Sequence, residues 1–160
     1  MKKEKFSTKK LEYLKKSDCF ICKGQIRKED TIFENKEFIA FLDIFPPTKG
    51  YAIVAPKKHF EDITEIPEKE LQKTMLLVKK VAKAIKAAYS PRRICLAQTG
   101  GLVSHFHFHV IPMYSKDWNT SENFKRVFFK EEILKFSQAK LKKIAGKIRK
   151  NLKLKKTGSK

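Results

Sequence analysis

Three of the four histidines in this 160-residue chain stand at alternate positions of one short stretch, as His105, His107 and His109. A β-strand points successive side chains to opposite faces, so this spacing places the three imidazoles on one strand face. The intervening Phe106 and Phe108 then point to the other face, toward a core. A neutral imidazole offers a nucleophilic nitrogen, a proton donor and a metal ligand. The stretch predicts a chemical site, although a solvated strand face and a metal-binding tract without catalysis share the pattern.

A second candidate site is the Cys-x-x-Cys pair of Cys19 and Cys22. Such a pair occurs in redox sites, in metal sites and as two buried thiols, and the spacing alone does not separate these. Tetrahedral zinc takes four nitrogen or sulfur ligands, so a zinc site needs two more residues from elsewhere in the chain. The third cysteine, Cys95, fits a thiol in the core.

Asp43 is the lone acid in a strongly apolar run that ends at a Pro-Pro loop. A carboxylate there is suited to binding a pair of hydroxyl groups, and it is equally suited to capping the loop that follows. The neighbouring Ile44 and Phe45 fit either a ligand pocket or an ordinary core.

The charge of the chain is unusual and unevenly distributed. The formal net charge is +20, from 37 Lys and Arg against 17 Asp and Glu. Residues 1–16 carry +5 and residues 130–160 carry +10, which leaves +5 for residues 17–129. Basic ends of this kind bind nucleic acid or an anionic membrane surface, and they also occur as a simply solvated lysine-rich surface.

The composition suits a globular protein. Hydrophobic residues make up 41% of the chain, which is ordinary for a domain with a core. No apolar run approaches the ~20 residues of a membrane span. The charged N-terminal segment lacks the apolar centre of a secretory signal. We therefore expect a cytoplasmic protein with reduced thiols.

Turn signals and hydrophobic periodicity predict an α+β domain with a mostly antiparallel sheet of about five strands. The predicted strands span residues 31–34, 38–42, 51–55 and 93–98 and the histidine stretch. A long helix is predicted from about Pro67 to Tyr89, with Met75 and Val78 in its buried stripe. A second, basic helix is predicted over residues 130–152, either as a docking helix with a solvated outer face or as a contact for nucleic acid or membrane.

The stretch His-Phe-His-Phe-His-Val-Ile-Pro at residues 105–112 resembles the signature of the histidine-triad superfamily of nucleotide hydrolases and transferases. Residues 38–59 resemble its nucleotide-binding segment, and Cys19 to Cys22 resembles its metal-binding variants. Residues 118–124 are similar to a stretch of the fragile-histidine-triad and diadenosine-polyphosphate phosphorylase branches. The resemblance covers roughly residues 17–125 and implies a nucleotide-binding catalytic domain at 17–129. The charge distribution adds a basic extension at 1–16 and a basic helix and tail at 130–160.

The resemblance also implies roles for single residues. His107 would attack the α-phosphorus of a nucleotide to form a nucleotidyl-histidine, with His109 and His105 completing the catalytic triad and His109 holding phosphate oxygens. Asp43 would accept both ribose hydroxyls. The further nucleotide-binding residues would be Ile44, Phe45, Gln98, Thr99, Gly100, Gly101 and Ser104.

A structural zinc ion would be held by Cys19, Cys22, His59 and His105, unless His59 lies near phosphate without a metal. The resemblance further implies a homodimer.

The implied function is a nucleotide hydrolase or nucleotidyltransferase that cleaves at the α-phosphate of dinucleoside polyphosphates or related AMP conjugates. One alternative is removal of adenylate from nucleic-acid ends, as in the aprataxin branch, which the basic ends would suit. Another is a non-catalytic nucleotide- or RNA-binding protein. This last alternative stays open because many relatives carry Asn, Gln or Ser at positions matching Cys95, Gly101 and Leu102, and those polar side chains are missing here.

Overall fold

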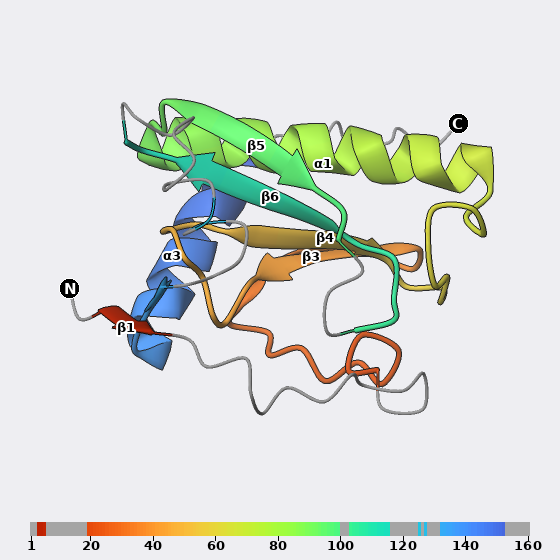
Figure 1. The fold of residues 1–160 in the computed structure, drawn as a ribbon, viewed down its shortest axis with the longest axis horizontal. Helices are drawn as coiled ribbons and strands as arrows, with labels where there is room; N and C mark the ends of the chain where they lie inside the picture. Colours follow the sequence, from red (N-terminus) through yellow and green to blue (C-terminus); the bar gives the residue numbers. More distant parts are fainter. Residues whose placement is uncertain are drawn as a thin grey trace.

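A five-stranded antiparallel sheet forms the centre of the molecule, with strand order β2-β3-β4-β6-β5. The computed structural model describes residues 3–5, 19–99, 103–115, 125, 127 and 132–152. The sheet strands are β2 (Thr31–Glu34), β3 (Phe38–Leu42), β4 (Ala52–Pro56), β5 (Arg93–Ala97) and β6 (Phe108–Met113). Helix α1 (Glu68–Tyr89) runs alongside the sheet, and helix α3 (Gln138–Asn151) packs at one end (Figure 1). The predicted α+β class and strand number are confirmed.

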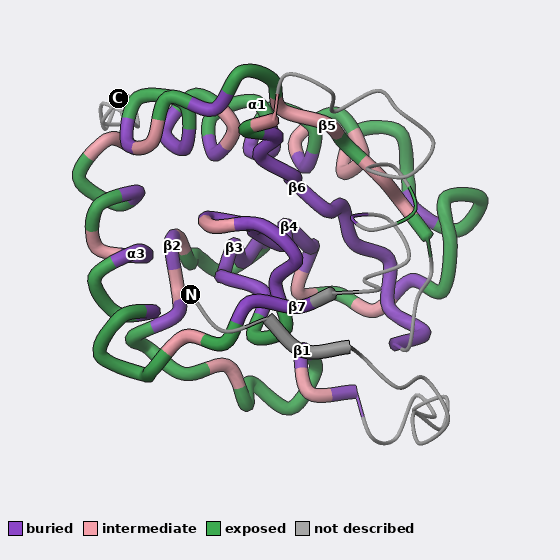
Figure 2. The backbone as a smooth tube through the Cα atoms, turned by 60° about the vertical axis from the view of Figure 1, so that its left-hand side comes forward, coloured by how far each residue is buried: buried purple, intermediate pink, exposed green. Residues whose placement is uncertain are grey.

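The sheet is buried on both faces at its centre, because β3 and β4 are apolar at every position (Figure 2). Residues alternate between two clusters, as strand geometry requires. In β3, Phe38 and Ala40 face the main core beneath α1 and α3, whereas Ile39 and Phe41 face a second cluster that includes Cys19. The second face of the sheet is therefore where the N-terminal cysteine turn docks.

Helix α1 begins one residue after Pro67 and ends at Tyr89. Ser90 caps it: the Ser90 N–H donates to the Lys86 carbonyl, and its left-handed backbone (φ 48°) turns the chain out of the helix. Its buried residues include Val78, as the periodicity predicts. The predicted stripe is wrong at Met75, which is 39% exposed. The buried face is centred instead on Leu77, Val78, Val81, Ala84, Ile85 and Ala88.

The predicted second helix begins later than residue 130. Residues Glu132–Leu134 form strand β7, which pairs with β1 (Lys3–Lys5) in a separate two-stranded sheet. Helix α3 starts at Gln138, where the Ser137 hydroxyl caps it by accepting from Lys140 N–H. Its apolar stripe of Leu141, Ile144, Ala145 and Ile148 is part of the main core. The helix therefore docks on the domain, while Lys142, Lys143 and Lys150 are exposed.

The histidine stretch obeys the predicted alternation, although the regular strand is shorter than predicted. Phe106, Phe108 and Val110 belong to the main core, on the side opposite the histidines. Strand β6 begins only at Phe108, so His105 lies in a bend and His107 in the irregular segment that leads into the strand. This entry segment is pinned by the Phe106 N–H, which donates to the Phe60 carbonyl at 2.7 Å.

Within the described parts of the chain, no helix is both long and apolar enough to cross a membrane. Most of the basic N-terminal extension, the stretch 118–124 and the tail after residue 152 lie outside the described residues. The predictions for these segments, and the division at residues 16 and 129, stay predictions.

Candidate active site and metal centre

The three alternating histidines belong to two adjoining clusters. His105 is fully buried and turns toward Cys19 and Cys22, with its Nδ1 3.3 Å and 3.4 Å from the two sulfur atoms. His107 and His109 turn toward each other, with their Nε2 atoms 3.0 Å apart. Both have at most 7% of their surface exposed. The stretch thus joins a sulfur-rich centre to a pair of imidazoles along one backbone.

The sulfur-rich centre contains the four residues predicted as metal ligands. Cys22 Sγ lies 3.2 Å from His59 Nδ1, and the ligand atoms of Cys19, Cys22, His59 and His105 all lie within 4.8 Å of one another. The cysteines come from a tight turn closed by the Lys23 N–H to the Cys19 carbonyl. Gly24 ends this turn at φ +64°, a conformation that favours glycine. The cluster has the donor set of a metal site.

The backbone of Pro56 fixes which nitrogen of His105 faces the sulfur atoms. His105 Nε2 is 2.9 Å from the Pro56 carbonyl oxygen, which can only accept, so Nε2 carries the hydrogen. Nδ1 therefore presents its lone pair toward Cys19 and Cys22. Burial is the main cause that lowers the pKa of His105 to about 4. The ring is consequently neutral at physiological pH, which a metal ligand requires.

A backbone carbonyl fixes His107 in the same way. His107 Nδ1 lies 2.6 Å from the His105 carbonyl oxygen, so Nδ1 carries the hydrogen and donates it. The Nε2 atom of a neutral His107 then presents a lone pair on the side of His109. An oriented imidazole with an unprotonated nitrogen is a competent nucleophile near neutral pH.

Asp43 lies at the end of β3, where the chain leaves the sheet. It is 5% exposed, and its Oδ1 accepts from the Phe45 N–H at 2.7 Å. The predicted loop-capping role is therefore present in the structure. Ile44 and Phe45 are 56% and 43% exposed, so they are surface residues rather than core. Their exposure beside a buried carboxylate suits the walls of a ligand pocket.

The loop after Asp43 is tied down by three other segments. The Leu134 N–H donates to the Pro46 carbonyl, and the Tyr114 hydroxyl donates to the Lys49 carbonyl, each at 2.8 Å. The Lys49 ammonium lies 4.2 Å from the centre of the Tyr89 ring. The C-terminal segment therefore helps to position the loop that carries the predicted pocket residues.

The remaining predicted nucleotide-binding residues come from the turn after β5. The Thr99 hydroxyl lies 3.4 Å from His109 Nε2, which places it beside the imidazole pair. Gln98 directly follows β5, and Ser104 is buried next to His105. Gly100 and Gly101 lie outside the described residues.

Two residues of the site, Pro56 and Tyr51, are not predicted as site residues from the sequence. The Pro56 carbonyl holds the tautomer of His105, and no side-chain pattern signals a backbone acceptor. Tyr51 packs edge-on against His109, with ring centroids 5.7 Å apart, and its carbonyl accepts from Asp43 N–H. Burial, and secondarily Asp43, raises the pKa of the Tyr51 hydroxyl. An apolar strand that begins with a tyrosine opposite Asp43 is the signal that points to this residue.

Comparison with known proteins agrees with this arrangement. The HIT domain model matches residues 25–116, more than half of the chain. An uncharacterised HIT-like protein of Mycoplasma genitalium is 40% identical over 101 residues, which cover 60% of this chain and 71% of that protein. An adenosine 5′-monophosphoramidase of Schizosaccharomyces pombe is 36% identical over 105 residues, covering 62% of this chain and 75% of the enzyme.

Among solved structures, a Zn-bound histidine triad family protein of Mycobacterium smegmatis superimposes with a TM-score of 0.66. The match covers 85% of this chain and 94% of that one, and at 21% identity it shows the fold. The domain match, the sequence relatives and the paired histidines agree with one another, and the chain belongs to the HIT-domain family.

Proposed function

We propose that the protein hydrolyses AMP conjugates at the α-phosphate through a covalent nucleotidyl intermediate on His107. Phosphoramidates of AMP are the first substrate class, because a phosphoramidase is among the relatives that share over a third of their aligned residues with this chain. Dinucleoside polyphosphates are the second class, since they present the same α-phosphorus with a different leaving group. The observation that carries the proposal is the bond from His107 Nδ1–H to the His105 carbonyl, which leaves Nε2 as the nucleophile.

The proposed reaction has two displacements. His107 Nε2 donates its lone pair to the α-phosphorus, and the bond from phosphorus to the leaving amine breaks as the amine takes a proton from water. Water then attacks the same phosphorus, the bond to Nε2 breaks, and AMP and a proton are released. His109 Nε2, 3.0 Å from the nucleophilic nitrogen, is placed to donate to a phosphate oxygen as negative charge develops.

Turnover of a substrate panel tests this activity. We expect adenosine 5′-phosphoramidate and diadenosine triphosphate to yield AMP with measurable kcat/KM. A protein that binds AMP but converts neither substrate would instead support the non-catalytic nucleotide-binding alternative.

We also propose that the metal held by the cysteine-histidine cluster is zinc. Zinc bonds of about 2.3 Å to sulfur and about 2.0–2.1 Å to nitrogen hold the donors of a tetrahedron roughly 3.5 Å apart. Three of the four sulfur–nitrogen separations here are 3.2–3.4 Å, and two thiolates with two neutral imidazoles are typical zinc ligands. Such an ion supplies structural support, because His107 and His109 lie outside its ligand set.

Asp43 is proposed to accept the ribose hydroxyls of the bound nucleotide. Asp43→Asn keeps an oxygen for the Phe45 N–H but removes the negative charge, so the loop is expected to remain in place. We expect kcat/KM for the adenosine substrate to fall about tenfold, the scale of a lost charge-assisted hydrogen bond. The matched measurement uses the 2′-deoxy substrate, for which the loss is expected to be smaller. Equal losses on the two substrates would contradict the ribose role.

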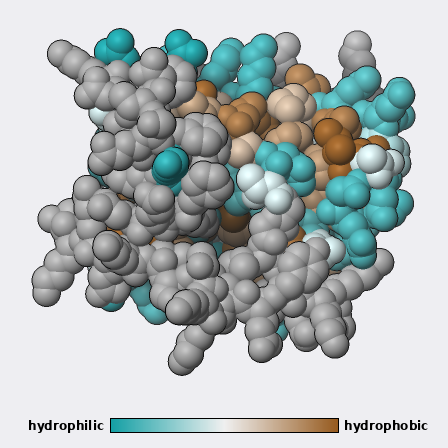
Figure 3. Space-filling model, viewed as in Figure 1, coloured by the Kyte–Doolittle hydropathy of each residue, from teal (hydrophilic) through white to brown (hydrophobic). Residues whose placement is uncertain are grey.

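A homodimer is proposed to form across strand β5 and the first half of α1. Among the described strands, β5 lies at an edge of the sheet and pairs with β6 alone, so its outer edge is placed to pair with a second copy. Met75, Leu76 and Leu96 expose 39–59% of their surfaces on these two elements. Figure 3 shows the corresponding apolar surface over β5 and α1. An apolar patch beside an open strand edge is typical of an interface.

Leu76→Glu combined with Leu96→Glu is expected to convert this dimer to monomers. In a two-fold interface each change places carboxylates of both copies in apolar surroundings. Light scattering at several concentrations measures the mass. Ile63→Glu is the matched control, because Ile63 is 51% exposed but belongs to neither element. A wild-type protein that is monomeric at every concentration would contradict the proposed dimer.

A further inference from the structure

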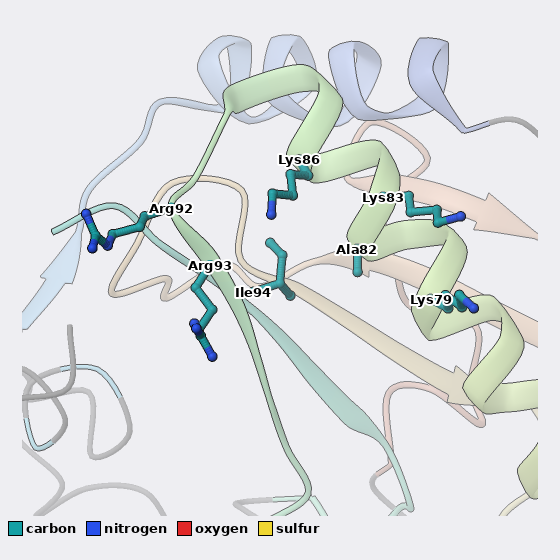
Figure 4. A pocket seen from close by; sticks show the side chains of 7 residues that line it. All are labelled: Lys79, Ala82, Lys83, Lys86, Arg92, Arg93 and Ile94. Carbon is teal, nitrogen blue, oxygen red and sulfur yellow. The ribbon is translucent and has the colours of Figure 1, made fainter. Parts of the chain in front are cut away.

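A basic groove lies between the second half of α1 and the start of β5 (Figure 4). It has a volume of about 360 Å³. Its charged lining residues are Lys79, Lys83, Lys86, Arg92 and Arg93. Ala82 and Ile94 form its apolar floor, and among the described residues no acidic side chain lines it. Five cations around one hollow are a candidate anion site that is separate from the cluster of histidines.

The three lysines form a row rather than a ring. Residues four and three positions apart on a helix lie on one side of it, at rises of about 6 Å and about 4.5 Å. All three lysines are exposed, and none belongs to an ion pair found among the described residues. A row of cations suits a chain of phosphates that are spaced by sugars, whereas a single phosphate is best held by converging charges.

The arginines extend this row across the groove. Arg92 precedes β5 and Arg93 begins it, and both are exposed. Figure 4 shows both on the β5 side of the groove, across from the lysines of α1. A guanidinium donates two parallel hydrogen bonds to one phosphate, which fixes the phosphate more firmly than an ammonium does. No aromatic ring lines the groove in the described residues, so it offers phosphate contacts without a surface on which bases stack.

The groove lies at the end of β5 that is distant from the catalytic histidines. Ala97 pairs with His109, whereas Arg93 pairs with Met113 four residues further along β6. Four residues of a strand span about 13 Å, so a ligand in the groove does not occupy the proposed catalytic centre. A ligand there is therefore bound independently of the nucleotide substrate.

We propose that this groove binds the phosphodiester backbone of a nucleic acid, without preference for sequence. Lys79, Lys83 and Lys86 neutralise successive phosphates along one wall, and the arginines bind a phosphate at the opposite end. The groove, rather than the exposed lysines of α3, is the main nucleic-acid contact of the described chain. This assignment does not depend on the proposed hydrolase activity.

The test compares two triple variants of the full chain that lose the same charge. Lys79, Lys83 and Lys86 are changed to Gln in one, and the exposed Lys142, Lys143 and Lys150 of α3 are changed to Gln in the other. The probe is a fluorescein-labelled thymidine oligonucleotide of about 12 residues, a length that matches single-strand sites. Fluorescence anisotropy measures Kd over a series of salt concentrations.

The groove variant is expected to bind about tenfold or more weakly at low salt and to lower the slope of log K against log salt by about two. The α3 variant is expected to change Kd by no more than about threefold, the scale of a loss in overall charge. Both variants should keep the wild-type melting temperature, mass and rate of phosphoramidate hydrolysis. The mass is measured because α1 and β5, which line the groove, also form the proposed dimer surface.

Three results would overturn the proposal. Equal weakening by the two variants assigns binding to overall charge, and weakening by the α3 variant alone assigns it to the C-terminal helix. The third result is a groove variant that keeps its oligonucleotide Kd but no longer sediments with phosphatidylserine vesicles. It would mean that the groove binds a membrane surface.

Discussion

Replacing His107 with alanine is expected to lower kcat for adenosine 5′-phosphoramidate by about three orders of magnitude or more, the scale for loss of a covalent nucleophile. The His107 Nδ1–H donates to the His105 carbonyl, which leaves Nε2 directed toward His109. Binding of AMP is expected to persist, because Asp43 and the loop after it remain in place. The measurements are kcat by product assay and the AMP Kd by calorimetry.

The fold of the variant is checked by its melting temperature, since His107 is 95% buried and its loss leaves a small cavity. Loss of AMP binding together with activity would point to a collapsed site instead of a missing nucleophile. A His107→Ala protein that turns over at the wild-type rate would show that the proposed mechanism is wrong.

Removing the proposed zinc is expected to destabilise the protein strongly while leaving His107 and His109, the proposed catalytic pair, in place. Without an ion, the buried Cys19 and His105 lose their main partner, at a cost of about 3–5 kcal/mol. The melting temperature of a chain this size then falls by roughly 10 °C. Scanning calorimetry with and without a strong chelator measures this change, and elemental analysis identifies the metal.

Cysteine variants provide the matched control. Cys22→Ser removes a ligand and is expected to lower both zinc content and melting temperature, whereas Cys95→Ser is expected to change neither. Cys95 is half-buried against a small apolar cluster that includes Tyr51 and Ile111, and it lies outside the ligand set. Two results would contradict the zinc assignment. One is protein purified without chelators that contains no metal, and the other is a melting temperature that stays the same when a chelator is added.

The sequence predicts the sheet well because its strands have clear local signals. The apolar run of β3, the turn at Asn35 and the Pro46–Pro47 loop each mark a boundary, and the strands start and end within about one or two residues of those signals. Asn35 Oδ1 accepts from Phe38 N–H at 2.6 Å, which is the local bond that such a turn predicts.

The sequence fails where tertiary packing decides between similar patterns. The apolar Leu134 fits a helical stripe, but its N–H bonds to the Pro46 carbonyl and its segment pairs with β1. Met75 fits the stripe of α1 by spacing, yet the helix turns that side outward toward the proposed dimer face. Neither the partner strand nor the direction of the helix is encoded in local periodicity.

The candidate site, like the fold, is predicted in part by local sequence patterns and in part depends on tertiary packing. Spacing alone places the three histidines opposite Phe106 and Phe108, which the structure confirms. His105 turns toward the cysteines, whereas His107 and His109 turn toward each other. This difference depends on where β6 begins and on the Pro56 carbonyl of the adjacent strand β4. The basic groove is missed because its lysines look like an ordinary solvated face. Their positions in one row, followed by the Arg92–Arg93 pair, become informative only when β5 lies beside α1.

The stereochemical course at phosphorus tests the central claim most directly. A substrate made chiral at the α-phosphorus with sulfur and oxygen isotopes is hydrolysed in isotopically labelled water, and the configuration of the product is determined. Two in-line displacements, first by His107 Nε2 and then by water, invert the phosphorus twice, so the account predicts net retention of configuration. Net inversion would mean that water attacks the substrate directly, and it would contradict a nucleotidyl-histidine on this chain.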